Sequence, residues 1–183
     1  RRCLLVVAFT WRIGVAGRVL AGGDVFSYFY PYWAEATRAI RALRLPGWNP
    51  YLFTGVPFAA NSQVGFFYPL NWPLWLLFPP HRAVHVSMVM HLCLAAVTAF
   101  VWGRRGLRLG RPGAWAAGAV FALGGYMSAQ VEHVNQLQGL AWLPLMLTLA
   151  GDMGGPMETW LGSKTPQATD WRPSLTRRRV KAA

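Results

Sequence analysis

The sequence predicts an all-α membrane protein with about four transmembrane helices. Hydrophobic residues make up 54% of the 183 residues, and charged residues only 13%, about half the charged share of an average soluble domain. Aromatic residues reach 14%, including ten tryptophans, and Trp and Tyr are enriched where a membrane meets water. The apolar residues also gather in long runs, which favours membrane spans over one soluble domain.

The net charge of +12, from 18 Lys and Arg against 6 acids, would also suit a nucleic-acid-binding protein. The basic residues instead flank apolar runs, and no nucleic-acid-binding motif is present, so we expect no nucleic-acid partner. The two cysteines, Cys3 and Cys93, lie inside apolar runs. Their spacing indicates small apolar helix residues rather than a disulfide framework or a metal site.

A membrane-spanning helix needs about 20 mostly apolar residues. The first run is the weakest, because Arg12 interrupts it, and a cleaved signal peptide over residues 1–21 is the competing interpretation. The sequence predicts spans at residues 3–20, 83–102, 112–129 and 137–150.

Two of these spans carry unusual residues. The third contains Gly118, Gly124 and Gly125, and such small residues let membrane helices approach closely, which predicts a helix packed inside a bundle. The fourth is short and contains Pro144, which neighbouring helices make tolerable in a membrane.

The positions of Lys and Arg predict the orientation of the chain. Basic residues precede the first span, fill the tail after the fourth, and occupy the short loop between the second and third as Arg104, Arg105, Arg108 and Arg111. Because cytoplasmic loops of membrane proteins are rich in Lys and Arg, we expect a multi-pass cell-membrane protein with both termini in the cytoplasm. Residues 1–150 would form the transmembrane region, residues 21–81 its outer loop, and residues 151–183 a basic cytoplasmic tail of disordered composition.

The outer loop is predicted to hold an amphipathic helix over residues 32–45 and a re-entrant or interfacial segment over residues 66–78. In the helix, Arg38, Arg41 and Arg44 recur at steps of three along one side. Such a helix would lie on the outer membrane surface, apolar side down. The alternative is that these arginines grip a lipid phosphate through their planar fork of donors.

Three polar residues follow the outer ends of two spans. Asp24 comes after the first span, and Glu132 and His133 come after the third. In the predicted topology both ends face the outside, so the acids would meet over one pocket at the membrane surface. Acids near membrane depth are functional candidates by default, although solvated loop charges would give the same pattern.

A series of short motifs covers roughly residues 20–150. The motifs are, in order, Gly23-Asp24, Tyr30-Pro31, Trp48-Asn49-Pro50-Tyr51, Gly55-Val56-Pro57, Asn61-Ser62-Gln63, Phe67-Tyr68-Pro69-Leu70-Asn71, Gly124-Gly125-Tyr126, His133, Asn135 and Trp142-Leu143-Pro144. This series resembles the opening of the bacterial YfhO family. That family is similar to the GT-C glycosyltransferases, multi-spanning enzymes that take sugars from polyprenyl-phosphate carriers on the outer face.

The resemblance implies roles for matching positions. Asp24 would be the catalytic base, accepting a proton from the acceptor hydroxyl, while Glu132 and His133 would bind the carrier phosphate or a metal. A cation would stabilise the departing phosphate, and the candidates are Arg38, Arg41, Arg82 and His133. Asp24 and Glu132 could supply two oxygens to a divalent metal, fewer than such an ion needs.

The sequence therefore predicts a membrane glycosyltransferase, or a fragment of one, that transfers a sugar from a polyprenyl-phosphate carrier to an extracytoplasmic acceptor. The likeness fades after about Ala150, where family members continue with more spans and a large outer domain, so a fragment would lack the acceptor site and be inactive. Two alternatives stay open: a non-catalytic or degenerate membrane protein, and part of a transporter or flippase. Only His85 and His91, inside the second span, favour the transporter.

Overall fold

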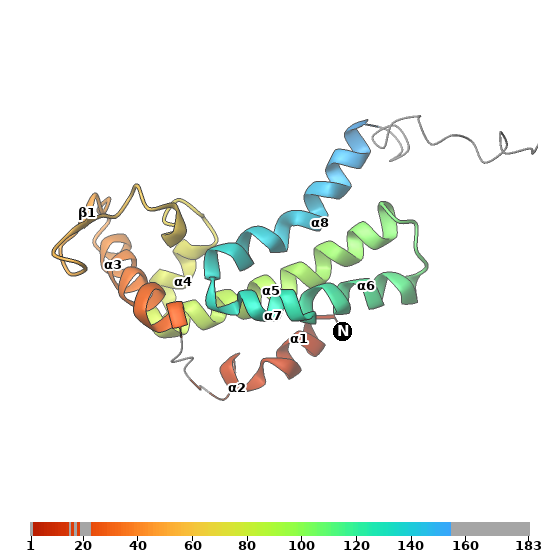
Figure 1. Cartoon of the computed structure of the whole chain (residues 1–183), viewed down its shortest axis with the longest axis horizontal. Coiled ribbons are helices and arrows are strands. Elements are labelled where there is room, and N and C mark those ends of the chain that lie inside the picture. Colours follow the sequence, from red (N-terminus) through yellow and green to blue (C-terminus); the bar gives the residue numbers. More distant parts are fainter. Residues whose placement is uncertain (1, 15, 17, 19–22, 155–183) are drawn as a thin grey trace, which may run out of the picture.

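The computed structural model describes residues 2–14, 16, 18 and 23–154, and within that part the chain is mostly helical, as predicted (Figure 1). The predicted basic tail falls almost wholly outside it. The α-helices are α1 (Arg2–Phe9), α2 (Trp11–Gly14), α3 (Tyr30–Arg41), α4 (Asn71–Leu77), α5 (Pro80–Arg105), α6 (Arg111–Leu123), α7 (Gly125–Ala129) and α8 (Val134–Gly154). Between them lie a π-helix η1 (Val25–Phe29), two 3₁₀ turns, η2 (Ser62–Val64) and η3 (Gln130–Glu132), and two short strands, β1 (Trp48–Asn49) and β2 (Val56–Pro57).

Helix α5 is the centre of the molecule. It has 26 residues, and its most apolar window has a mean hydropathy of 2.0, which makes it long and apolar enough to cross a membrane. It is the one helix of the described residues that is both. The other chain elements bury 56% of that window, and the core helix of a soluble protein would show the same features. The predicted number of four spans therefore stays a prediction.

Helices α6 and α8 pack along α5 (Figure 1). Small residues make the α5–α6 contact close. A Cβ added to Gly118 would lie 2.6 Å from the main-chain oxygen of Ala96, and one added to Gly103 would lie 3.2 Å from the Cα of Ala114. The glycine-rich third segment thus approaches α5 closely, but only Ala114, Gly118 and Ala122 of α6 are buried, so its predicted position inside a bundle is not shown.

The continuous first span predicted at residues 3–20 is wrong over its described part. Helix α1 ends at Phe9, and α2 covers only Trp11–Gly14. The chain turns at Thr10, whose main-chain N and hydroxyl both donate to the oxygen of Val6, at 2.8 and 2.7 Å. Residues 15, 17 and 19–22 lie outside the described residues.

The third and fourth predicted spans also differ in extent from the helices of the structure. The third, predicted as one helix over residues 112–129, breaks at Gly124, which has ψ of 159° and so cannot continue a helix. Helix α6 stops there and α7 begins at the next residue. The fourth is longer than predicted, because α8 has 21 residues and continues through Pro144. The hydroxyl of Thr148 donates to the oxygen of Pro144, 2.8 Å away, within that helix.

The predicted helix over residues 32–45 begins earlier and ends earlier, as α3. It stops at Arg41 because Leu43 has a φ of 51°, a left-handed conformation that a helix cannot contain. Its apolar side is covered by the protein itself: Trp33 is fully buried and meets Trp75 of α4 edge to face, with ring centres 5.4 Å apart. The apolar side of α3 is thus turned toward the protein core rather than toward a bilayer.

The rest of the outer loop is ordered. Strands β1 and β2 pair in antiparallel register, Trp48 opposite Pro57 and Asn49 opposite Val56. Gly55 has a φ of 114°, and a Cβ there would lie 2.7 Å from the Trp48 ring. The segment 66–78 forms no long re-entrant structure, because it consists of turns and the seven-residue helix α4, which packs against α3 and α5.

Candidate functional site

The structure brings together three of the residues singled out from the sequence. The Oδ2 atom of Asp24, at the start of η1, lies 3.4 Å from Nε2 of His133, which follows η3. Both side chains are partly exposed, 57% for Asp24 and 43% for His133. A carboxylate at this distance can hold the imidazole in a chosen tautomer and orientation.

Glu132 completes the group. Its carboxylate lies directly against Gly23, so closely that a Cβ at Gly23 would overlap Oε2 of Glu132. Gly23 also has a φ of 55°, which only glycine adopts without cost. We call Asp24, Glu132 and His133 the acid–histidine cluster. It joins two segments more than a hundred residues apart in the sequence.

A phenol lies close to this cluster. Tyr28, about one turn after Asp24, accepts a hydrogen bond from Nδ2 of Asn61 at 2.6 Å. Burial raises the pKa of Tyr28 above its ordinary value, and the charge of Asp24 raises it further. Tyr28 therefore stays protonated at neutral pH.

An apolar cavity of about 220 Å³ has Val131, the residue before Glu132, in its wall. It is lined by residues of α1, α5 and the α6–α7 segment. Most of its lining is aliphatic or aromatic, as in ligand pockets that bind apolar groups. Phe9, at the end of α1, and Thr10, which follows it, contribute to the wall, and α5 contributes Met88, Val89 and Leu92.

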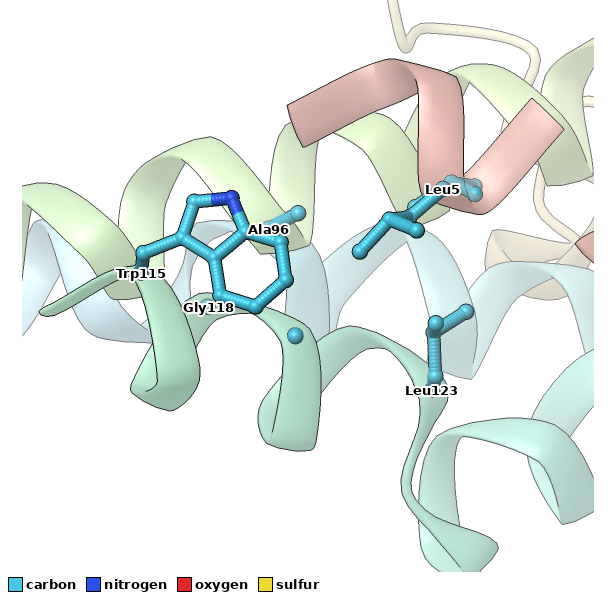
Figure 2. A pocket seen from close by; sticks show the side chains of 7 residues that line it. Leu5, Ala96, Trp115, Gly118 and Leu123 are labelled. Atoms are coloured by element: carbon cyan, nitrogen blue, oxygen red, sulfur yellow. The ribbon is translucent and has the colours of Figure 1, made fainter. Parts of the chain in front are cut away.

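Two other hollows differ in character. A crevice of about 10 Å³ between α1, α5 and α6 is lined by Leu5, Ala96, Trp115, Gly118 and Leu123, among others (Figure 2). It is at the lower limit for a single water, so it is a packing gap. A wider, open hollow of about 550 Å³ lies where η1 and α3 meet the start of α5, with Ser27, Tyr30 and His81 in its wall.

The predicted phosphate-binding arginines of α3 have other partners. Arg38 pairs with Glu35 at 2.9 Å, and its guanidinium lies 4.6 Å from the ring centre of Tyr51. Arg41 donates to three main-chain oxygens at the end of α4, those of Trp75, Leu76 and Phe78, at 3.2 to 3.3 Å. Arg82, the third predicted arginine, is half-buried in the first turn of α5. Arg41 therefore caps α4, because its charge satisfies free carbonyls at a helix C-terminus.

Glu35 was not anticipated from the sequence. It is 1% exposed and forms ion pairs with both Arg38 and Arg44. The only sequence signal was an acid three residues before Arg38, a spacing that places the two side chains on one side of a helix. The arginine stripe thus neutralises a buried carboxylate.

A buried polar network was also missed. Nε2 of Gln138, in α8, donates to Oδ1 of Asn71 at 2.8 Å and to Oγ of Ser87 at 3.1 Å. Asn71 in turn donates to the main-chain oxygen of Gly65, 3.1 Å away. The network therefore ties the outer loop to both α5 and α8.

A second branch runs beside it. The Tyr68 hydroxyl lies 2.9 Å from Nε2 of His91 and accepts a hydrogen bond from Nε1 of Trp142 at 2.7 Å. His85, one to two turns earlier in α5, bonds the Tyr30 hydroxyl at 2.8 Å. Both histidines are buried and have polar partners.

Metal binding at the acid–histidine cluster is not supported. Within the part of the chain that the structure describes, no group of three or more His, Cys, Asp or Glu side chains is arranged to hold a metal ion.

Comparison with known proteins adds no identification. No family model matches the chain, no curated protein is similar to it, and no solved structure matches it. The resemblance to the YfhO family thus depends on the short motifs in the sequence alone.

Proposed function

We propose that this chain is a membrane glycosyltransferase, or the N-terminal part of one, that transfers a sugar from a polyprenyl-phosphate carrier to an acceptor outside the cytoplasm. One observation carries the proposal. Asp24, Glu132 and His133 come from distant segments and meet, and Val131, which precedes Glu132, lines an apolar cavity.

In this proposal Asp24 is the general base. The acceptor hydroxyl forms a bond to the anomeric carbon of the sugar while the bond from that carbon to the carrier phosphate breaks. Asp24 takes the proton of the hydroxyl, for which a carboxylate must come within about 3 Å. Its exposed side chain is accessible to a polar acceptor, and the 3.4 Å contact with His133 holds it in place.

The carrier lipid would place its chain in the apolar cavity of about 220 Å³. Because Val131 lines the cavity and precedes Glu132, a lipid held there would present its phosphate near the cluster. His133, when protonated, is the cation of the cluster that can stabilise the leaving phosphate. Arg38 and Arg41, which the sequence suggested for this purpose, are engaged elsewhere.

The proposed setting is a multi-pass membrane protein with α5 across the bilayer and both termini in the cytoplasm. Four arginines at the C-terminal end of α5 and after it support this orientation: Arg104, Arg105, Arg108 and Arg111. Loops that are rich in Lys and Arg tend to stay in the cytoplasm. The acid–histidine cluster would then face the outside. This arrangement gives an outward-facing site access to a lipid-linked donor.

The test is sugar transfer in membranes that contain the protein, with a polyprenyl-phosphate hexose radiolabelled in the sugar as the donor probe. Asp24→Asn removes the base but keeps the side-chain shape, so the transfer rate should fall about 10²- to 10⁴-fold. Asp152→Asn, which changes an exposed acid on α8, is the matched control and should transfer normally. An Asp24→Asn protein that is as active as the control would remove Asp24 as the base.

A non-catalytic membrane protein is the second candidate, and one observation favours it. Arg38, Arg41 and Arg44 are used for internal pairing and capping, which leaves few cations to hold a carrier phosphate. For this candidate we expect no transfer by the unmodified protein and equal stability of Asp24→Asn and Asp152→Asn.

A further inference from the structure

The two cysteines meet in space. Cys3 belongs to α1 and Cys93 to α5, 90 residues later, yet the Cys93 thiol approaches the main-chain oxygen of Cys3 at 4.0 Å. The sequence suggested only two unrelated apolar positions.

The helices that carry the thiols are packed together. Helix α1 lies along α5 (Figure 1), and Val6, about one turn after Cys3, is 1% exposed in the core. Cys3 is exposed and Cys93 is half-buried. One sulfur is therefore open to a reagent, and the other is placed behind it, as in pairs where one cysteine reacts first and the second resolves it.

We propose that Cys3 and Cys93 form a redox-sensitive pair, in which oxidation by a low-molecular-weight disulfide links α1 covalently to α5. This inference is independent of the proposed function. Two cysteines can be bridged only where their side chains lie close together, and the 4.0 Å approach of the Cys93 thiol to the main chain of Cys3 is the observation that favours a bridge.

The reaction is a pair of thiol–disulfide exchanges. The Cys3 thiolate attacks the small disulfide, forms a mixed disulfide and releases one thiolate. The Cys93 sulfur then attacks Sγ of Cys3, the new S–S bond forms, and the second small thiol leaves. The two protein thiols are oxidised by two electrons, the small disulfide is reduced to two thiols, and the two protons pass to those thiols.

The link would act on the apolar cavity. Phe9, the last residue of α1, and Thr10, which follows it, line that cavity together with Met88 and Leu92 of α5. With α1 tethered to α5, this wall is fixed, and without the tether α1 is held by packing alone. Oxidation should therefore raise the midpoint temperature of unfolding.

The experiment treats the purified full chain with oxidised glutathione and follows free thiols by maleimide labelling and mass spectrometry. We expect both thiols to disappear together, a linked peptide pair that contains Cys3 and Cys93, and a return to the starting form with dithiothreitol. Cys93→Ser should instead stop at a glutathione adduct on Cys3.

A matched control moves one thiol and keeps the number of thiols. In Cys93→Ser/Leu94→Cys the sulfur turns by about 100° around α5, away from α1. This variant should collect glutathione adducts without an internal link. The proposal is overturned if the unmodified protein also collects two adducts and no link, or if the control links as fast, with circular dichroism to show that each protein is folded.

Discussion

Gly23 is the residue on which the acid–histidine cluster depends. It has a φ of 55°, and the Glu132 carboxylate occupies the space where a side chain would begin. Gly23→Ala should lower the free energy of unfolding by about 1–2 kcal/mol through its backbone conformation, and it should also push Glu132 aside. Thermal or denaturant unfolding in detergent measures the first effect.

Gly47→Ala is the matched control, because a Cβ at Gly47 has no atom within 4 Å and its φ is not left-handed. It should leave the stability nearly unchanged. Equal stability of the two variants would mean that Gly23 does not have the left-handed conformation described above.

For individual residues, the sequence was sufficient to predict only some of the contacts. Asp24 and His133 could be expected to meet, because both follow the outer ends of predicted spans, and the structure places them 3.4 Å apart. The roles given to them remain predictions. Glu35 could not be recognised, because its burial depends on Arg44, which α3 brings back toward it only through the turn at Leu43.

At the scale of the elements, the contact of α5 with α6 depends on Gly118. A Cβ there would lie 2.6 Å from a main-chain oxygen of α5, and backbone cannot move aside as a flexible side chain can. Gly118→Val should therefore destabilise the protein by about 1–3 kcal/mol through overpacking. A lower midpoint of thermal unfolding would show it.

Gly139→Ala, in α8, is the control for that prediction. Nothing lies within 4 Å of a Cβ at this position, so the substitution should stabilise the helix by up to about 1 kcal/mol through helix propensity. If Gly118→Val is as stable as this variant, the two helices do not pack as closely as described.

What the sequence could not predict about the helices and strands also has physical reasons. The break at Gly124 could not be predicted, because a glycine inside an apolar run fits a continuous membrane helix as well as a broken one. The turn signals at Pro46-Gly47 and Asn49-Pro50 indicated an ordered loop. Such local turn signals do not show that Trp48 pairs with Pro57, because a pairing across that distance depends on where the loop packs.

At the scale of the whole molecule, the buried network of Asn71, Ser87 and Gln138 joins the outer loop to α5 and α8. No periodic pattern in the sequence predicts such a network, because a single polar residue in an apolar helix is not part of a repeating pattern. It nevertheless fixes the loop near the first turns of α5. The acid–histidine cluster and the loop therefore lie toward the same half of the molecule (Figure 1).

Labelling of engineered cysteines can test whether α5 crosses a membrane. The 26 residues of α5 measure about 39 Å at about 1.5 Å per residue, more than the about 30 Å of a bilayer core. If α5 crosses it, the exposed residues His81, in the first turn of α5, and Arg108, three residues after its end, must face opposite sides. In a Cys3→Ser/Cys93→Ser background, His81→Cys should react with a membrane-impermeant maleimide added to intact cells. Arg108→Cys should react only after the membrane is opened, because positive loops stay in the cytoplasm. Labelling of both cysteines in intact cells, or of neither, would show that α5 is not a transmembrane helix and would leave the acid–histidine cluster without access to a lipid-linked donor outside.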